Sequence, residues 1–97
     1  MIIRIVKLTF REEEIPGFLG IFDASKTFIR NMPGCRHLEL LNDIATPNIF
    51  FTCSHWDSEE DLNNYRNSEL FGEVWKKTKV LFSDKPQAWS LRQKAAP

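Results

Sequence analysis

The hydrophobic residues of this chain recur either at every second position, as in strands, or at every third or fourth position, as in helices. The order of these segments along the chain restricts the possible folds more than any other property. Residues 1–10 alternate between apolar and polar side chains, which is typical of a strand. Acidic residues followed by Pro16 then mark the start of a helix. Pro33 and Gly34 end it, because proline disfavours helical geometry in the residue before it. The predicted buried face of this helix consists of Ile15, Phe18, Leu19, Phe22, Ser25 and Ile29.

The second half of the chain contains two segments with the hydrophobic spacing of strands, then two with the spacing of helices, and a last one with the spacing of a strand. Residues 35–43 and 48–56 are β-type runs around the turn sequence IATP, which predicts a hairpin. Ser58 and Ser68 are suited to N-caps, so we predict a short helix followed by a longer one. Residues 85–91 are typical of a last strand, which their proline restricts to a sheet edge or a strand start. The predicted buried face of the longer helix consists of Phe71, Val74, Trp75, Thr78, Leu81 and Phe82.

This order of elements, β-α-β-β-α-β, is the split βαβ pattern of ferredoxin-like folds. We therefore predict a single α+β domain over residues 1–97, with an antiparallel sheet and helices on one face of it. Alternate residues of a strand point to opposite faces, so the run 48–56 can be divided by parity. One face carries Phe50, Thr52, Ser54 and Trp56, and the other carries Ile49, Phe51, Cys53 and His55. Because both faces hold large apolar groups, we expect a homodimer in which a second sheet covers the open face.

Composition favours a small cytoplasmic protein over one that binds nucleic acid, enters a membrane or is secreted. The 13 basic and 13 acidic side chains balance, and the basic ones are scattered rather than gathered in a phosphate-binding stripe. No apolar run approaches the roughly 20 residues that span a bilayer. Cys35 and Cys53 are too few for a disulfide scaffold and follow no signal peptide, so we expect buried free thiols. A domain of this size is marginally stable alone, which also favours dimerisation.

Three segments carry a family pattern: NMPGC before the second strand, FFTCSHWDSEEDL across the third strand, and NSELFGEVW at the start of the longer helix. Together they resemble the antibiotic biosynthesis monooxygenase superfamily, whose members are dimeric α+β barrels. The family pattern is a Pro-Gly turn, a strand that ends in Trp, an acidic helix start and a Ser-x-x-Phe segment. Its positions in this sequence are Pro33, Gly34, Trp56, Asp57, Glu59, Ser68 and Phe71.

The resemblance implies a pocket between sheet and helices and, for the monooxygenases of the family, an oxidation by molecular oxygen that needs neither metal nor flavin. Their substrates are polycyclic phenols or quinols, and the substrate anion supplies the electrons. Trp56 matches the Trp that lines this pocket, where an indole can stack on a flat ring and donate its N–H to an oxyanion. Thr52 lies where some members carry Asn, and its hydroxyl can donate one hydrogen bond. We therefore predict Trp56 and Thr52 as catalytic residues.

Seven further residues are predicted to contact a substrate: Val6, Phe10, Phe50, Tyr65, Phe71, Trp75 and Lys76. The large aromatic members would exclude water. Lys76, like Arg66, is expected near the pocket entrance, where a cation lowers the pKa of a phenol. Tyr65 ends the short helix, and its phenol reaches either the pocket mouth or the surface. Both Trp56 and Trp75 also suit plain core packing, and the spacing of Trp75 fits a buried helical face.

Haem degradation, the activity of another branch of the family, is disfavoured. That branch uses an Asn in the first strand and a His ligand in the Ser-x-x-Phe helix, and these positions hold Val6 and Trp75. An indole N–H is only a donor and does not bind iron in that way. We also predict no metal site elsewhere. His37 and His55 can be cross-strand neighbours beside Cys53, but they lack a carboxylate at fixed spacing.

Two functions therefore compete. The first is a cofactor-independent monooxygenase that oxidises a small aromatic or quinol substrate. The second is a non-catalytic dimeric domain that binds a small apolar ligand or acts in assembly, which the lack of a clear acid or base on the Trp56 face favours. The sequence contains no Gly-rich phosphate loop, nucleophile elbow or paired catalytic carboxylates, so hydrolytic chemistry has no support.

Overall fold

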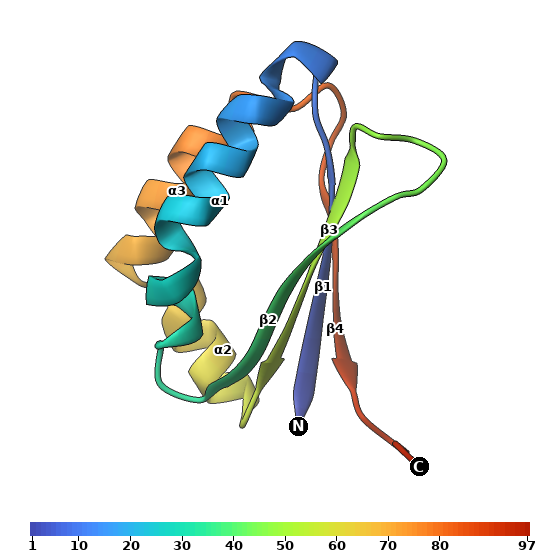
Figure 1. Ribbon diagram of the computed structural model, residues 1–97. Helices are drawn as coiled ribbons and strands as arrows, with labels where there is room; N and C mark the ends of the chain where they lie inside the picture. The colour runs from blue at the N-terminus through green and yellow to red at the C-terminus, as the bar shows by residue number, and fades with distance from the viewer.

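A four-stranded sheet with three helices on one of its faces makes up the computed structural model, which describes residues 1–97 (Figure 1). The elements are β1 (Ile2–Thr9), a 3-10 turn η1 (Glu12–Glu14), α1 (Ile15–Arg30), β2 (Cys35–Asn42), β3 (Ile49–Trp56), α2 (Glu59–Arg66), α3 (Glu69–Lys79) and β4 (Gln87–Arg92). Their order is the predicted one, and the α+β prediction is confirmed. The two predicted caps are also confirmed: Ser58 and Ser68 each accept a hydrogen bond from a backbone N–H in the first turn of the helix that follows.

The strands are ordered β2-β3-β1-β4, and every neighbouring pair is antiparallel, as in a ferredoxin-like sheet. In the central pair Val6 of β1 lies opposite Thr52 of β3, and Ala88 of β4 lies opposite Val6 on its other side. Residues directly opposite one another point to the same face of a sheet. Val6, Thr52 and Ala88 therefore form a row across the middle of the face that the helices cover.

A β-bulge at the start of β2 changes the face to which its residues point. Cys35 pairs with Trp56 and His37 pairs with His55, so the register shifts at Arg36. In a regular strand Cys35 and His37 would share a face. Here Cys35 is buried under the helices beside Trp56. His37 lies on the opposite face, where its ring centroid is 4.7 Å from that of His55, which confirms that these two are cross-strand neighbours.

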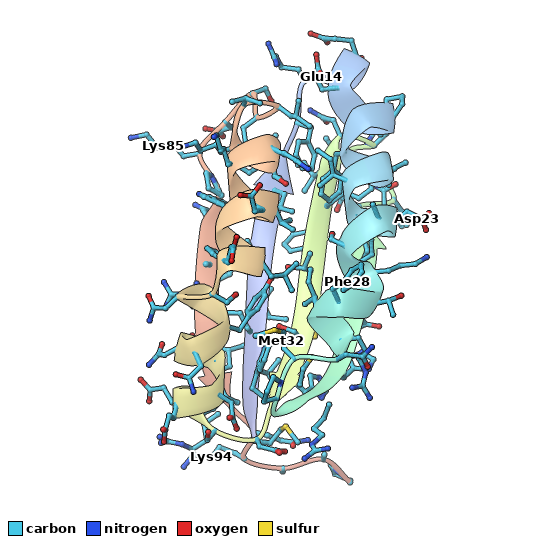
Figure 2. All side chains as sticks on the ribbon, turned by 90° about the vertical axis from the view of Figure 1, so that its left-hand side faces the viewer. Glu14, Asp23, Phe28, Met32, Lys85 and Lys94 are labelled. Atoms are coloured by element: carbon cyan, nitrogen blue, oxygen red, sulfur yellow. The ribbon has the colours of Figure 1, made fainter.

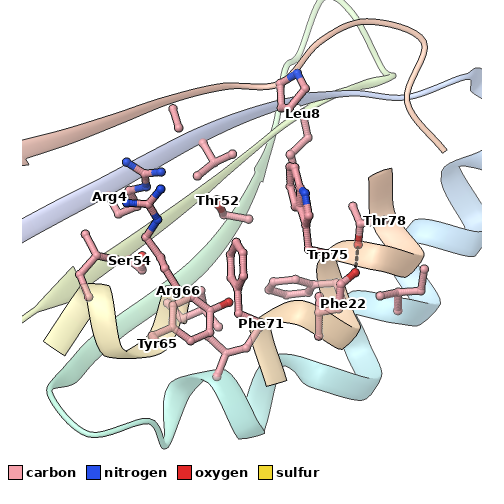
Figure 3. Close-up of a pocket in the computed structure, with 18 of the residues that line it drawn as sticks. Arg4, Leu8, Phe22, Thr52, Ser54, Tyr65, Arg66, Phe71, Trp75 and Thr78 are labelled. Atoms are coloured by element: carbon pink, nitrogen blue, oxygen red, sulfur yellow. Dashed lines mark hydrogen bonds between the residues drawn. The ribbon is translucent and has the colours of Figure 1, made fainter. Parts of the chain in front are cut away.

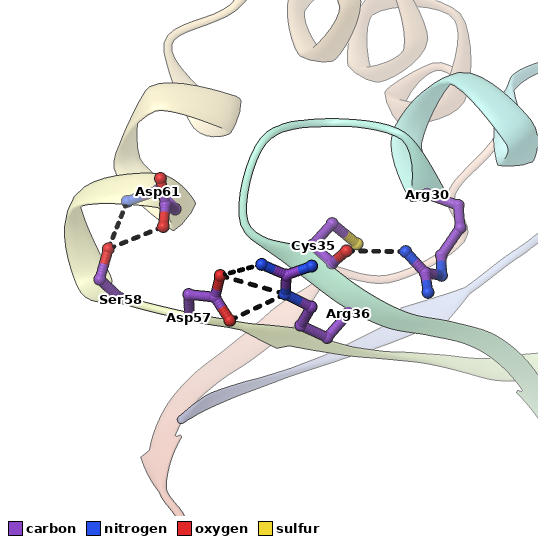
Figure 4. A network of polar contacts seen from close by, with 6 residues as sticks. All are labelled: Arg30, Cys35, Arg36, Asp57, Ser58 and Asp61. Carbon is purple, nitrogen blue, oxygen red and sulfur yellow. Dashed lines mark hydrogen bonds and ion pairs between the residues drawn. The ribbon is translucent and has the colours of Figure 1, made fainter.

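The turn between α1 and β2 is packed against the start of α2. Gly34 has a φ of 83°, in the left-handed region that favours glycine, and a Cβ at this position would collide with the Asp61 side chain. Asp61 lies in the capped first turn of α2, where its backbone N–H donates to Ser58 Oγ over 3.1 Å. Beside it, Arg36 makes a bidentate ion pair with Asp57, with Nε 2.9 Å from Oδ1 and Nη2 2.6 Å from Oδ2 (Figure 4).

Two groups of buried side chains lie between the sheet and the helices, one at each end of the β1–β3 pair. The first consists of Leu8, Phe10, Phe18 and Phe50, and the second of Cys35, Trp56 and Leu62. Neither group includes Val6 or Thr52, at the middle of the sheet. The core is therefore dense at both ends of the central strands, and the site described below lies between these ends.

The predicted buried face of α1 is correct except at Leu19. Phe18, Ser25 and Ile29 are buried, whereas 42% of the Leu19 surface is exposed. Successive residues are about 100° apart around a helix, so Leu19 points away when Phe18 points at the sheet. Figure 2 shows α1 beside α2 and α3 over the central strands, with Phe28 on the outer, solvent side of α1.

The other face of the sheet is open to solvent (Figure 1). Its apolar residues include Ile3, Ile5, Leu41, Ile49, Phe51, Trp89 and Leu91. Trp89 is 43% exposed and Leu91 is 47% exposed. Apolar side chains on both faces of the sheet were predicted and are present. No helix of the chain combines the length and the hydropathy that a membrane crossing requires.

Candidate functional site

A cavity of about 380 Å³ lies between the middle of the sheet and the helices. It is lined by 19 residues, of which 13 are hydrophobic, and they come from all four strands or their ends and from all three helices. Small-molecule sites in proteins are mostly apolar and measure roughly 300–1,000 Å³. The size and lining of this cavity are therefore those of a site for a small, largely apolar molecule.

The cavity has a polar end and an apolar end (Figure 3). The polar end is formed by Arg4, Ser54, Tyr65 and Arg66. Leu8, Phe22, Trp75 and Thr78 form the apolar end, and Thr52 and Phe71 lie between the two. A molecule that fills the cavity would thus meet cations and hydroxyl groups on one side and aromatic rings on the other.

The start of α3 determines where its aromatic side chains enter the cavity. Ser68 Oγ accepts a hydrogen bond from the Phe71 backbone N–H over 3.1 Å, which fixes the first turn of the helix. Phe71 and Trp75 are one turn apart and stack, with ring centroids 6.0 Å apart and an interplanar angle of 10°. Thr78 adds no free polar group, because its hydroxyl donates to the Val74 carbonyl over 2.7 Å. The helix therefore presents two parallel rings to the cavity.

Of the nine residues predicted for the site, five line the cavity. They are Val6, Thr52, Tyr65, Phe71 and Trp75. Val6 and Trp75 are the positions at which the haem-degrading branch would need Asn and His, and no histidine lines the cavity. Tyr65 lines the cavity rather than lying on the surface, since its ring packs between Trp56 and Phe71.

Trp56 does not line this cavity, although the sequence predicts it in a pocket wall. Its side chain is completely buried, against Cys35 and Leu62. Its ring stacks on Tyr65 with centroids 5.0 Å apart, and its Nε1 donates to Ser54 Oγ over 2.9 Å. Both of these neighbours do line the cavity. Trp56 therefore lies directly behind the wall, because α2 covers the end of β3.

Phe10, Phe50 and Lys76 also lie outside the cavity, contrary to the prediction. Phe10 is fully buried and Phe50 is 5% exposed, and both pack on Phe18 in the dense end of the core. Lys76 follows Trp75 by one residue and is exposed, since a step of about 100° turns it away from the sheet. The cations that line the cavity are instead Arg66, which the sequence also predicts near the pocket, and Arg4, which it does not.

Sequence reasoning missed two residues of the polar end, Arg4 and Ser54. Ser54 shares its strand face with Thr52, and this parity was a signal that could have identified it. Arg4 had a similar signal, since it lies two residues before Val6 on β1 and therefore points to the same face. A cation on the covered face of a central strand is rare unless it has a partner or a function.

The two arginines dominate the electrostatics of the cavity. No Asp or Glu lines it, and neither Arg4 nor Arg66 forms an ion pair. Burial, and then the neighbouring charge of Arg66, lower the pKa of Arg4. Arg4 Nη1 donates to Ser90 Oγ on β4 over 2.9 Å. The cavity thus carries two positive charges that no protein carboxylate balances.

Two hydroxyl groups of the cavity, those of Tyr65 and Thr52, have no hydrogen-bond partner in the protein and are available to a ligand. Burial, followed by the nearby Cys35, raises the pKa of Tyr65 to about 12. The phenol is therefore protonated at neutral pH, where it donates a hydrogen bond and does not act as a base. The structure contains no group of three His, Cys, Asp or Glu side chains that could hold a metal ion.

Comparison with known proteins gives one family match. The sequence profile of the family described as "Antibiotic biosynthesis monooxygenase" matches residues 1–77. A search of curated protein sequences finds no match.

Several solved structures have the same fold. A conserved protein from Methanosarcina mazei Go1 is 19% identical, with a TM-score of 0.91 over 97% of this chain and 94% of that one. Rv0793 from Mycobacterium tuberculosis is 17% identical, with a TM-score of 0.90 over 98% and 96% of the two chains. A structure described as an antibiotic biosynthesis monooxygenase is 18% identical, with a TM-score of 0.90 over 100% of both. At these identities the likeness establishes the fold alone.

Proposed function

Because the chain belongs to the antibiotic biosynthesis monooxygenase family, we propose that it is a cofactor-independent monooxygenase that oxidises a small aromatic or quinol substrate in the cavity. The observation that carries this proposal is the composition of the cavity: stacked aromatic rings, free hydroxyl donors and two cations, with no nucleophile and no carboxylate. Such a lining suits a reaction in which the substrate anion itself reduces oxygen.

The chemistry can be written for a phenol that is oxidised to a para-quinone. The phenol loses its O–H proton, and the resulting phenolate donates electrons to O₂ from the ring. One oxygen atom forms a new bond to the ring carbon opposite the phenolate oxygen and becomes the second carbonyl. The other oxygen atom leaves as water with two hydrogens, one from that ring carbon and one from the phenol. The substrate loses four electrons and O₂ gains four, so no other reductant is required.

The chain contributes binding and charge stabilisation to this reaction. Phe71 and Trp75 would hold a flat ring by stacking, since their own rings are nearly parallel. Thr52 and Tyr65 would donate hydrogen bonds to the substrate oxygen, which becomes more negative as the phenol ionises. Arg66 would favour that ionisation, because a nearby positive charge lowers the pKa of a phenol.

Ser54 replaces Trp56 as the residue that we propose contacts the substrate oxygen. Ser54 Oγ accepts the indole N–H of Trp56, so its own hydroxyl hydrogen remains available to donate into the cavity. Trp56 then acts as a positioning residue, which orients Ser54 by a hydrogen bond and Tyr65 by stacking.

We also propose that the protein is a homodimer that packs sheet on sheet. The open face carries the apolar groups Trp89 and Leu91, both almost half exposed in a single chain. A small domain gains stability when such a surface is removed from water.

Oxygen uptake tests the proposed function. A panel of polycyclic phenols and quinols is added to the protein in an oxygen electrode, and quinone formation is followed by absorbance. We expect uptake equal to the product formed, with about a tenfold loss of kcat/KM in Ser54→Ala. Lys76→Ala, which alters an exposed residue outside the cavity, should retain the activity of the wild type. Quinone formation no faster than in buffer, for every member of the panel, would contradict the proposal.

The second candidate is a non-catalytic domain that binds a small ligand. One observation favours it: the titratable groups that line the cavity are two arginines and a tyrosine whose pKa is about 12, so none can act as a base near neutral pH. Saturable binding of a phenol, together with no oxygen uptake, would identify this function.

A further inference from the structure

From the unbalanced charge of the cavity we infer that its ligand is an aromatic carboxylic acid, whose carboxylate binds between Arg4 and Arg66 and whose rings extend toward Trp75. The inference names a substrate class for the proposed site and rests on the proposed function only in assuming that the cavity takes a ligand. In such a ligand the permanent acid group, and not the phenol oxygen that ionises during the reaction, pairs with Arg4 and Arg66. Stabilisation of the phenolate would then come from the hydroxyl groups of Thr52, Ser54 and Tyr65.

The first argument is that the two cations have no protein counter-charge. All 19 residues that line the cavity lack a carboxylate, although the chain contains 13 Asp and Glu residues. Arg36, which is exposed, has Asp57 as a bidentate partner, whereas Arg4 and Arg66 have none. Two adjacent guanidinium groups repel each other, and a bound anion would turn that repulsion into attraction.

The second argument is that hydrogen-bond donors remain free. A guanidinium has five N–H donors in a planar fork that matches a carboxylate. Arg4 is anchored to the rigid central strand β1, and only Nη1 is used, in its bond to Ser90. Arg66 makes no side-chain hydrogen bond within the protein. Arg66 lies at the end of α2, where its positive charge interacts favourably with the helix dipole. That interaction needs no hydrogen bond from the guanidinium, so its N–H donors remain free.

The third argument is the shape of the site. The arginines lie together at one end of the cavity, and the aromatic and aliphatic residues lie at the other (Figure 3). Their proximity is also apparent in the effect of Arg66 on Arg4, whose pKa is lowered. A neutral phenol would leave the half-buried charge of Arg4 without a counter-charge beside mostly apolar walls. A molecule with one carboxylate and a flat apolar body satisfies both ends at once.

The test uses three probes of the same shape: anthracene-2-carboxylate, its primary amide and the corresponding aminomethyl cation. Each is titrated into the full-length protein by calorimetry at pH 7.5, without any need for turnover. We expect the carboxylate to bind at least about tenfold more tightly than the amide, as for hydrogen bonds to a charged partner, and the cation to bind most weakly. Both Arg4→Gln and Arg66→Gln should reduce this preference, and the double variant should remove it.

Lys76→Gln is the matched control, because it removes the same charge from an exposed residue on a neighbouring helix that does not line the cavity. It should keep the preference for the acid. If Arg4→Gln fails to fold by circular dichroism, Arg66→Gln alone decides, since Arg66 is exposed at a helix end.

Equal affinity for acid and amide overturns the inference, as does an equal loss of preference in Lys76→Gln and Arg66→Gln. Binding of none of the probes overturns it too. These outcomes are separate from the failure of the proposed function. A strong preference for the acid without oxygen uptake by any substrate supports the inference and contradicts the monooxygenase. Oxygen uptake with neutral phenols, together with equal affinity for the acid and the amide, supports the monooxygenase and contradicts the inference.

Discussion

The indole Nε1 of Trp56 donates a hydrogen bond to Ser54 Oγ over 2.9 Å, and both residues are buried on the helix-covered face of β3. Only Ser54 reaches the cavity. The conspicuous tryptophan at the end of the strand thus acts one layer behind the surface that a ligand would touch, and this relationship can be tested directly.

We expect Ser54→Ala to lower the free energy of unfolding by about 1–3 kcal/mol, because it leaves the buried indole N–H of Trp56 without an acceptor. Trp56→Phe removes the donor as well as ring volume, and the double variant should be less destabilised than the sum of the two single changes. Urea unfolding of all three variants measures the coupling. Strict additivity would mean that the hydrogen bond contributes nothing.

Phe10 and Trp75 should respond differently to truncation. Phe10 is fully buried among Phe18, Phe50 and Phe82, so Phe10→Ala should cost about 3–5 kcal/mol of stability. Trp75 is half-buried with one side on the cavity, so Trp75→Ala should cost less, about 1–2 kcal/mol. It should instead weaken the binding of an aromatic ligand by roughly three- to tenfold. Thermal unfolding and calorimetric titration distinguish these effects.

The stability of the protein should fall between about pH 10 and pH 12 through Tyr65. Burial raises the pKa of this phenol from 10.0 to about 12, so the folded state favours the neutral form. That contribution is complete below pH 10, where the unfolded phenol is also neutral, and is lost as the pH rises through the folded value. Its full size is about 3 kcal/mol, since each pKa unit corresponds to about 1.4 kcal/mol. The phenol makes no hydrogen bond within the protein, so Tyr65→Phe should be nearly neutral at pH 7.

The comparison of Tyr65→Phe with the wild type isolates this effect from the lysines and arginines that titrate nearby. Chemical unfolding at pH 8 and again at pH 11.5 should show the variant gaining relative stability at the higher pH. A constant difference between the two proteins across this range would contradict the raised pKa.

Gly34 and Gly20 provide a matched pair of glycine substitutions. Gly34→Ala should destabilise by more than about 1 kcal/mol, because its φ of 83° disfavours alanine and its Cβ would collide with Asp61. Gly20 lies inside α1 with open space around it, so Gly20→Ala should stabilise by about 0.5–1 kcal/mol. Thermal unfolding of the two variants should show shifts of opposite sign.

The proposed dimer predicts a mass in sedimentation equilibrium of twice the 11.4 kDa of the chain. Trp89→Glu places a charge on the open face of the sheet and should shift the equilibrium toward monomer. Phe28→Glu is its control, because Phe28 is 66% exposed on the outer side of α1 (Figure 2). A monomeric wild-type protein, or equal effects of the two changes, would contradict packing sheet on sheet.

The element order, both serine caps and the apolar character of the two sheet faces were all predictable from the sequence. Each depends on residues within a few positions of one another. An N-cap requires only Ser58 and the backbone of the next turn, and strand parity requires only alternate residues. Such local rules hold whatever the rest of the chain does.

The position of the site depended on contacts between distant segments. Phe50 and Thr52 share a strand face, yet the first packs against Phe18 of α1 and the second lines the cavity. Trp56, on the same face, is covered by Leu62 of α2. Parity assigns a face to each residue, but how close a helix approaches along that face is decided by side chains from elsewhere in the chain.

The charged end of the cavity also required the tertiary structure. Arg4 lies on the first strand and Arg66 at the end of α2, and no local pattern brings them together. They meet because β1 is a central strand, and the helix that follows its partner β3 returns across the covered face. The sequence by itself determined the elements and the fold; only the packing of helices on the sheet decided which side chains enclose the cavity, because that packing joins residues far apart in the chain.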